Sequence, residues 1–289
     1  MATSAAARVD LRSLPLRAPS PFIKWVGGKG RLLAQLLPLL PPGVERMRHV
    51  EPFSGGAAMF FARRPERALL CDVNAALVET YRMVRDEVDA VIDALEPLAE
   101  DHGKEAYYRV RTRYNETRHG AHGPQRAAMF IYLNKTCFNG LHRVNKKGEF
   151  NVPAGRYKNP RIIDGEGLYA ASAELQKAEL KNVPFEALLE QARPGDFVYL
   201  DPPYEPVSTT ASFTSYARDG FTQEDQTRLR DVFDALTRRG CKCMLSSSDV
   251  PFIRELYRKH RIDTVAAPRA VNCDASKRGN VTEVVVRNY

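Results

Sequence analysis

The stretch Phe197-Val198-Tyr199-Leu200-Asp201-Pro202-Pro203-Tyr204 decides the fold that this sequence predicts. Its first four residues form a short run of apolar and aromatic side chains, which is typical of a buried strand. A carboxylate and two prolines follow at once, and in open α/β sheets the ligand site lies beyond the carboxyl ends of the strands. We therefore expect Asp201 to end a central strand of an α/β sheet and to face a ligand.

The last four residues of this stretch carry the strongest chemical signal. The two prolines fix the backbone and donate no hydrogen bond, so Pro202, Pro203 and the Asp201 carboxylate present acceptors. Acceptors suit an amino group, and the ring of Tyr204 is a flat face on which a planar base can stack. We predict that these four residues are catalytic; the alternative is a rigid turn with a capping Asp.

Strands and helices alternate on both sides of this stretch. The clearest helix is expected over Gln223–Arg239, because Thr222 and Asp225 form a capping pair and Gly240 follows the end. Alternation of this kind predicts a mostly parallel sheet with right-handed crossovers. Apolar runs predict the other strands at residues 48–50, 68–71, 241–246, 262–266 and 282–287.

A glycine loop, Glu51-Pro52-Phe53-Ser54-Gly55-Gly56-Ala57, follows the first of these strands. Glycines let the backbone approach a ligand, and the helix expected over 57–62 begins there with free amide donors. Asp72 ends the next strand, where an acidic side chain can accept both hydroxyls of a ribose. We expect a nucleoside-bearing cofactor; a dinucleotide is disfavoured because the loop is not GxGxxG.

The segment Lys24-Trp25-Val26-Gly27-Gly28-Lys29-Gly30 invites comparison with a phosphate loop. It lacks the GxxxxGK spacing and the Ser or Thr that such a loop requires, so that interpretation is rejected. The tryptophan and the lysines suit the rim of a nucleoside site close to a DNA backbone. The alternative is a tight turn in which Trp25 is only a core anchor.

Composition limits the class of protein. The chain has 289 residues, 44% of them hydrophobic and 27% charged, which is enough for a sizeable core. Its five cysteines include no CxxC pair, which disfavours a disulfide framework or a zinc knuckle and fits a reducing cytoplasm. No apolar stretch is long enough to cross a bilayer. Residues 1–20, rich in Ala, Ser and Arg, are expected to be a disordered tail.

The positive charge is concentrated in one segment. Between Lys104 and Arg161 the chain has thirteen basic and three acidic residues, a net charge of +10 against +8 for the whole chain. Aromatic and Asn side chains interleave with this charge, which favours a nucleic-acid surface over a solvated helix face. We interpret residues 76–165 as an inserted, mainly helical recognition domain, and residues 21–75 and 166–289 as the catalytic domain.

Together these segments resemble the Dam-type (D12 class) site-specific DNA adenine methyltransferases. The resemblance covers about Phe22 to Tyr289 and departs at Ala57, where the family usually has glycine. Residues 272–280 do not align residue by residue. Further matching segments are Tyr132-Leu133-Asn134-Lys135, Phe138-Asn139-Gly140-Leu141, Arg143-Val144-Asn145, the run from Gly148 to Tyr157, Phe213-Thr214-Ser215-Tyr216 and the end from Thr282 to Tyr289.

The resemblance implies a Rossmann-like sheet that binds S-adenosylmethionine, flips adenine out of double-stranded DNA and methylates its 6-amino group. GATC is the expected target, and Arg143 is expected to read one of its guanines. A bacterial or phage source and no obligate protein partner are expected, and a partner restriction endonuclease is left open. The implied cofactor contacts are Trp25, Lys29, Phe53, Gly55, Asp72 and Asp201. The implied DNA contacts are Lys24, Phe138, Asn139, Leu141, Arg143, Pro153 and Arg156.

Other chemistries are weighed against this one. No cysteine follows a proline, which disfavours the nucleophile of a cytosine ring-carbon methyltransferase. The six histidines are scattered, so we expect them at the surface and expect no metal. Two alternatives stay open, an amino-group methyltransferase acting on RNA or on a protein glutamine, and a catalytically dead DNA-binding module. The basic insertion and the Asp at position 201 argue against the glutamine substrate.

Overall fold

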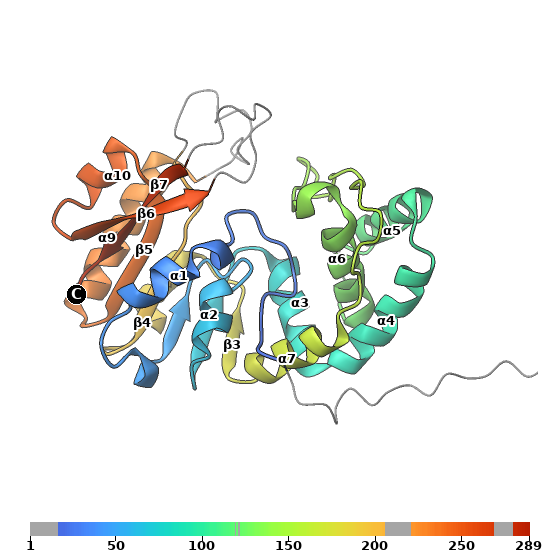
Figure 1. The fold of residues 1–289 in the computed structure, drawn as a ribbon, viewed down its shortest axis with the longest axis horizontal. Coiled ribbons are helices and arrows are strands. Elements are labelled where there is room, and N and C mark those ends of the chain that lie inside the picture. The colour runs from blue at the N-terminus through green and yellow to red at the C-terminus, as the bar shows by residue number, and fades with distance from the viewer. Residues whose placement is uncertain (1–16, 119, 121, 206–220, 269–279) are drawn as a thin grey trace, which may run out of the picture.

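A single seven-stranded sheet forms the centre of the described structure (Figure 1). The computed structural model describes residues 17–118, 120, 122–205, 221–268 and 280–289. The strand order is β3-β2-β1-β4-β5-β7-β6, and β7 runs in the direction opposite to the other six strands. The strands are β1 (His49–Glu51), β2 (Ala68–Cys71), β3 (Ala178–Lys181), β4 (Phe197–Leu200), β5 (Lys242–Ser248), β6 (Arg261–Pro268) and β7 (Asn280–Arg287).

This order confirms the predicted α/β class with a Rossmann-like sheet. The chain builds outward from β1 to β3 and then returns to place β4 on the other side of β1. Such a reversal is the topological switch point at which open α/β sheets bind ligands. The glycine loop follows β1 and the Asp201 tetrapeptide follows β4, so both lie at this point of the sheet.

The strand β3 was missed by the sequence analysis. Its sequence Ala178-Glu179-Leu180-Lys181 has no β-branched residue and is typical of a helix. It is a strand because it pairs in parallel with the edge of β2, from Ala68 beside Ala178 to Cys71 beside Lys181. Tertiary pairing therefore overrides local propensity here.

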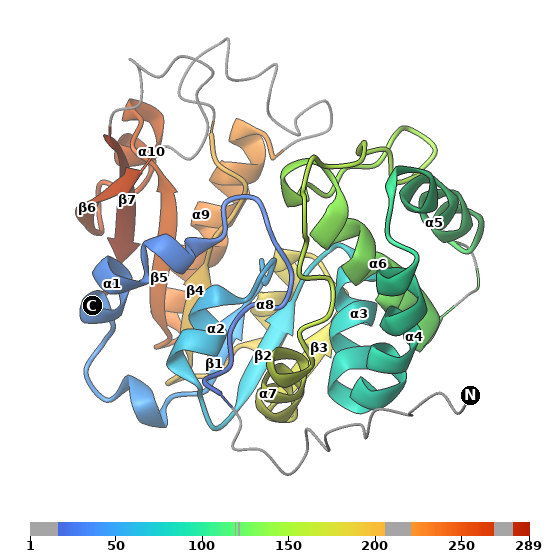
Figure 2. The ribbon, with the colours of Figure 1, turned by 45° about the vertical axis from the view of Figure 1, so that its right-hand side comes forward.

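Helices cover the sheet and extend beyond one of its edges (Figure 2). The predicted capping box of α9 is present, with Thr222 and Asp225 bonding each other's backbone. The helices are α1 (Leu33–Leu36), α2 (Ala58–Arg63), α3 (Ala75–Asp86), α4 (Val88–Glu100), α5 (Lys104–Glu116), α6 (Pro124–Thr136), α7 (Gly165–Leu175), α8 (Leu188–Gln191), α9 (Gln223–Arg238) and α10 (Pro251–Leu256). The last α-helix of the basic segment, α6, ends at Thr136.

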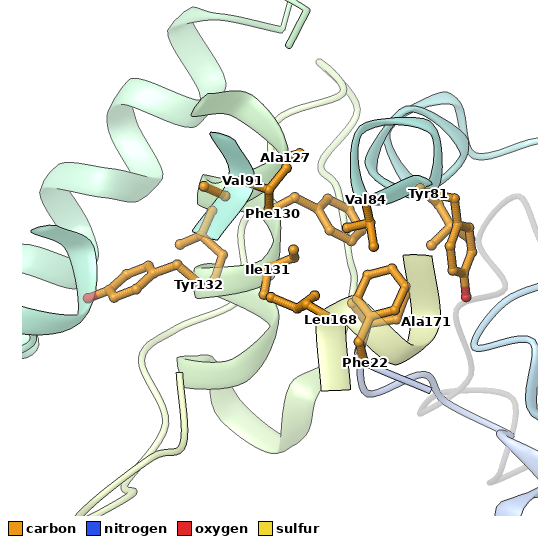
Figure 3. Packing of buried hydrophobic residues seen from close by; sticks show 14 of the residues in the cluster. Phe22, Tyr81, Val84, Val91, Ala127, Phe130, Ile131, Tyr132, Leu168 and Ala171 are labelled. Atoms are coloured by element: carbon orange, nitrogen blue, oxygen red, sulfur yellow. The ribbon is translucent and has the colours of Figure 1, made fainter. Parts of the chain in front are cut away.

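One buried hydrophobic cluster joins the helices of residues 76–165 to the rest of the protein. Phe22 of the N-terminal segment packs edge-on against Tyr81 of α3, with ring centroids 5.2 Å apart. Figure 3 shows both rings in the same cluster as Phe130 of α6 and Leu168 of α7. Burial of these side chains holds α6 and α7 against α3, and the division of the chain into a catalytic domain and an insertion stays a prediction.

The expectation that the histidines lie at the surface was wrong for His49. This side chain is fully buried in β1, and its Nε2 lies 2.7 Å from the carboxylate of Glu51. Burial lowers the pKa of His49, because the charged ring is poorly solvated there. His142 is partly buried, and burial lowers its pKa to about 4. Among the described residues, no helix is long and apolar enough to cross a membrane.

Candidate active site

The carboxylate of Asp201 and the ammonium of Lys29 meet beyond the end of β4. Lys29 Nζ lies 2.6 Å from Asp201 Oδ1, and the lysine side chain is 4% exposed. Lys29 also donates to the carbonyl of Gly27 at 2.6 Å, and its ammonium lies 4.6 Å from the centre of the Tyr204 ring. Two residues predicted from separate motifs are thus in direct contact.

The pKa of Asp201 is raised to about 6. Burial is the main cause, because a carboxylate loses hydration when it leaves water. The charge and hydrogen bonding of Lys29 act in the opposite direction, whereas Glu283 and Glu51 add like-charge repulsion. Asp201 is therefore an acceptor whose charge depends on pH close to neutrality.

Two contacts hold the tetrapeptide after β4 in place. The Tyr204 hydroxyl donates to Glu283 Oε2 of β7 at 2.6 Å. Gln226, a fully buried residue of α9, donates to the carbonyl of Pro203 at 3.0 Å. The carbonyl of Pro203 therefore already has one partner within the protein.

Asp72 closes the glycine loop onto the end of β2. Its Oδ2 accepts from the Gly55 amide at 3.0 Å, and its Oδ1 accepts from the Asn74 amide at 2.9 Å. Each carboxylate oxygen has a second lone pair, so both can still receive a hydroxyl. Burial raises the pKa of Asp72, and the backbone donors oppose that shift. These contacts are compatible with the predicted role of Asp72 as the acceptor for the ribose hydroxyls.

The backbone of the glycine loop favours glycine at two positions. Gly55 has a φ of +43°, and a Cβ there would lie 2.6 Å from Cδ1 of Trp25. Ala57 has a φ of 51°, in the left-handed region that costs a non-glycine residue roughly 1–2 kcal/mol. The chain therefore keeps the glycine backbone at residue 57 although the residue is alanine.

Aromatic side chains line the same part of the molecule. Trp25 packs against Gly55 and is partly buried at the edge of the main core cluster. Phe53 stacks on Phe185 with ring centroids 5.5 Å apart and contacts Phe221 edge-on at 5.7 Å. Phe185 follows β3, and the sequence analysis did not connect it with the site. The predicted cofactor residues Phe53, Gly55, Asp72 and Asp201 thus follow the ends of the neighbouring strands β1, β2 and β4.

The predicted DNA contacts form a second group. Buried Asn134 of α6 accepts from the Lys24 amide at 2.7 Å and donates to the carbonyls of Lys24, at 2.7 Å, and Gly140, at 3.3 Å. The amide of Phe138 donates to the Pro153 carbonyl at 2.9 Å. Lys24, the turn from Phe138 to Leu141, and Pro153 are therefore brought together. Asn139, at the tip of this turn, is exposed and has a φ of 54°.

Arg143 lies on a short hairpin that follows this turn. Val144 and Phe150 form an antiparallel bridge, and Arg143 Nε donates to Asn151 Oδ1 at 2.7 Å. Glu149, the acidic residue of the same hairpin, lies 3.3 Å from Nη1 of Arg118. Arg156 is exposed. The matching segment from Phe213 to Tyr216 lies outside the described residues.

Similarity to known proteins decides the family. The family model for D12 class N6 adenine-specific DNA methyltransferases matches residues 25–271. The chain belongs to this family. It therefore transfers a methyl group to adenine in DNA, and its substrate is DNA.

Relatives with curated names resemble the chain over nearly its whole length. It is 42% identical over 273 residues to the type II methyltransferase M1.LlaDCHI of Lactococcus lactis, covering 93% of this chain and 95% of that one. It is 40% identical to the type II methyltransferase M.MjaIII of Methanocaldococcus jannaschii, with 93% and 99% covered. It is 35% identical to the DNA adenine methylase of Escherichia coli K12, with 91% and 93% covered.

In the structure of this methyltransferase, residues that the sequence analysis did not select contact the predicted site residues. Asn134 and Glu283 lie inside segments that carried the resemblance, so their motifs were visible although their contacts were not. Gln226 lies in a helix that was predicted only from its apolar face and caps. His142 was dismissed with the other histidines. Among the described residues, no group of three or more His, Cys, Asp or Glu could hold a metal ion.

Proposed function

We propose that the enzyme uses S-adenosylmethionine to methylate the 6-amino group of an adenine that it flips out of double-stranded DNA at GATC. The observation that carries this proposal is the contact between Asp201 and Lys29 at the end of β4, beside Tyr204. It places a buried acceptor, a cation and an aromatic face in one site. These groups suit a planar base with an exocyclic amino group.

The residues around the glycine loop fit a nucleoside cofactor. Asp72 has lone pairs available for ribose hydroxyls, Gly55 leaves room for the indole of Trp25 against the loop, and Phe53 and Trp25 offer apolar walls. The buried carboxylate of Asp201 suits a ligand that carries positive charge. When bound, S-adenosylmethionine supplies an electrophilic methyl group on its sulfonium.

The chain's own residues prepare the nitrogen that receives the methyl group. The amino lone pair of adenine is delocalised into the ring, so it is a poor nucleophile until the nitrogen is held toward tetrahedral geometry. Asp201 and the carbonyl of Pro202 can accept hydrogen bonds from the two hydrogens of the amino group, and Tyr204 can stack on the adenine ring. Alignment of the reacting atoms supplies much of the rate in such a direct displacement.

Double-stranded DNA with base flipping is supported by charge and by geometry. The segment from Lys104 to Arg161 supplies a net charge of +10 for phosphate contacts. The amino group of a paired adenine is engaged within the duplex, so an enzyme that modifies it gains access by extruding the base. Arg143 uses only its Nε in the hydrogen bond to Asn151, which leaves the Nη groups out of that contact and suited to a guanine.

Two experiments test the proposal. Labelled S-adenosylmethionine is incubated with the enzyme and with duplex DNA, RNA and protein side by side; transfer to duplex DNA alone is expected. Transfer to RNA or protein instead would establish the alternative substrate, and cofactor binding without any transfer would establish an inactive DNA-binding module. Methylated adenines are then mapped in DNA from cells that express the chain, and every site is expected to lie within GATC.

A further inference from the structure

His142 lies between the predicted DNA-reading turn and the predicted cofactor pocket. It follows Leu141 and precedes Arg143, both of which are predicted DNA contacts. Its ring stacks on Trp25, with centroids 5.6 Å apart and planes inclined by 22°. The backbone of His142 therefore directly follows the turn, whereas its ring contacts Trp25, a predicted cofactor contact.

One path of contacts runs from His142 through Trp25 to Asp72. Trp25 packs so closely on Gly55 that a Cβ on the glycine would lie 2.6 Å from the indole. The amide of Gly55 donates to Asp72 Oδ2 at 3.0 Å. Direct contacts thus connect the His142 ring with Asp72, the residue that we expect to hold the ribose.

A second path reaches Asp72 through Asn74. The Asn74 side-chain oxygen accepts from the Leu77 amide at 3.1 Å, so its amino group is directed at His142 Nδ1, 3.3 Å away. Burial lowers the pKa of His142 to about 4, which keeps the ring neutral at pH 7 and able to accept at Nδ1. The backbone amide of Asn74 donates to Asp72 Oδ1 at 2.9 Å.

On the DNA side the ring of His142 is enclosed by the hairpin and by α6. Its centroid lies 5.5 Å from that of Phe130 and 5.8 Å from that of Phe150. Phe150 precedes Asn151, the hydrogen-bond partner of Arg143. The position of Arg143 is therefore tied to the His142 ring through the hairpin as well as through the adjacent peptide bond.

We propose that His142 is a positioning residue that couples DNA recognition to cofactor binding, so that each ligand binds more tightly when the other is present. This inference rests on the proposed function, since it requires a cofactor at Asp72 and a DNA base at Arg143. A ligand that fixes Trp25 and Asp72 also fixes the ring, which lowers the entropy cost of ordering the turn for the second ligand. The coupling is reciprocal by thermodynamic necessity.

Trp25 provides the signal for the test because it is the only tryptophan in the chain. Its fluorescence is used to measure the Kd of S-adenosylhomocysteine for the full-length enzyme, alone and with a saturating short duplex that carries the mapped target site. The ratio of the two Kd values is the coupling factor. For the wild-type enzyme we expect a factor of about 5 to 150, the usual range for coupled sites.

Three variants locate the coupling at His142. His142→Ala removes both paths, and its coupling factor is expected to fall to within about twofold of 1 while the Kd of the cofactor product without DNA changes by less than about threefold. His142→Phe keeps a ring against Trp25, and His142→Gln keeps an acceptor for Asn74, so each is expected to lower the factor partially. Lys146→Ala, at the exposed hairpin, is the control: it can weaken DNA binding but should keep the wild-type factor.

The outcomes separate this inference from the proposed function. A wild-type coupling factor of 1, or a wild-type factor in His142→Ala, overturns the role of His142. If His142→Ala does not fold, wild-type factors in both His142→Phe and His142→Gln overturn it equally. A wild-type enzyme that binds neither the cofactor product nor any duplex contradicts the proposed function itself, and this is seen before any variant is made.

Discussion

Lys29 and Asp201 form an ion pair across two loops, with Nζ and Oδ1 2.6 Å apart and the lysine almost fully buried. The two residues are far apart in the sequence, and each belongs to a motif that was interpreted separately. The lysine charge stabilises the ionised carboxylate in a setting where burial disfavours it. This pair therefore sets the pH range in which Asp201 can accept hydrogen bonds as an anion.

The first prediction concerns that pH range. Since the pKa of Asp201 is about 6, kcat/KM for methyl transfer to DNA should be highest above this pH and should fall as the pH drops through it. Lys29→Met removes the stabilising charge, so the acid limb should move to higher pH. Arg31→Met, an exposed neighbour, is the control and should leave the limb in place. An acid limb at the same pH in Lys29→Met would show that the lysine does not tune Asp201.

The second prediction concerns the chemical role of Asp201. Asp201→Ala should abolish methyl transfer but keep the fold and much of the DNA affinity, because the basic segment that supplies affinity lies elsewhere. Asp201→Asn should also be strongly impaired, since a neutral acceptor replaces a charged one. Single-turnover rates near those of the wild type in both variants would exclude the proposed role.

The third prediction concerns the hydrogen bond between Tyr204 and Glu283. Tyr204→Phe keeps the stacking ring but loses the 2.6 Å contact that ties it to β7. Combined with Glu283→Gln in a double-mutant cycle on kcat/KM, the pair should show a coupling energy of about 1.5 to 3 kcal/mol. Tyr204→Phe combined with Glu255→Gln, a change on the surface of α10, should be additive. Additivity in the first cycle as well would mean that Glu283 does not position the tyrosine.

The fourth prediction assigns Asp72 to the cofactor. Asp72→Ala should weaken S-adenosylmethionine binding by about 1.5 to 3 kcal/mol, the range for hydrogen bonds to a charged group. Part of that loss comes through the amides of Gly55 and Asn74, which lose their acceptor. Calorimetry measures the affinity, with Asp86→Ala at the exposed end of α3 as the control. Equal affinities for the two variants would reject the assignment.

The strand ends and the loops that follow them could be predicted from the sequence, because the chemistry of adjacent residues determines them. The apolar run before Asp201 and the capping box before α9 are properties of adjacent residues, and both appear in the structure as expected. The strand β3 could not be predicted from the sequence, because only its pairing with β2 makes it a strand. The contact of Tyr204 with Glu283 joins residues distant in sequence, so only the folded sheet could show it. His142 was missed because an isolated histidine has no motif.

The last prediction is that Arg143 reads a guanine of GATC. Glu149, the acidic residue of the same hairpin, pairs with Arg118 and not with Arg143, which supports this role. Asn151 holds the Nε of Arg143 and thereby orients the guanidinium, whose two prongs match the two major-groove acceptors of guanine. Arg143→Ala should therefore cost about 1 to 3 kcal/mol on GATC and relax discrimination at that base pair.

Arg156→Ala is the matched comparison, because Arg156 is exposed and is expected to contact phosphate rather than a base. Loss of a phosphate contact should weaken all duplexes alike and reduce the salt dependence of binding by about one unit in the logarithmic slope. Kinetics on GATC and on each single-base variant, at several salt concentrations, distinguish the two behaviours. If Arg143→Ala keeps the wild-type preference at every position, the guanine contact must come from another residue, because loss of a base-reading arginine necessarily changes the preference at the base that it reads.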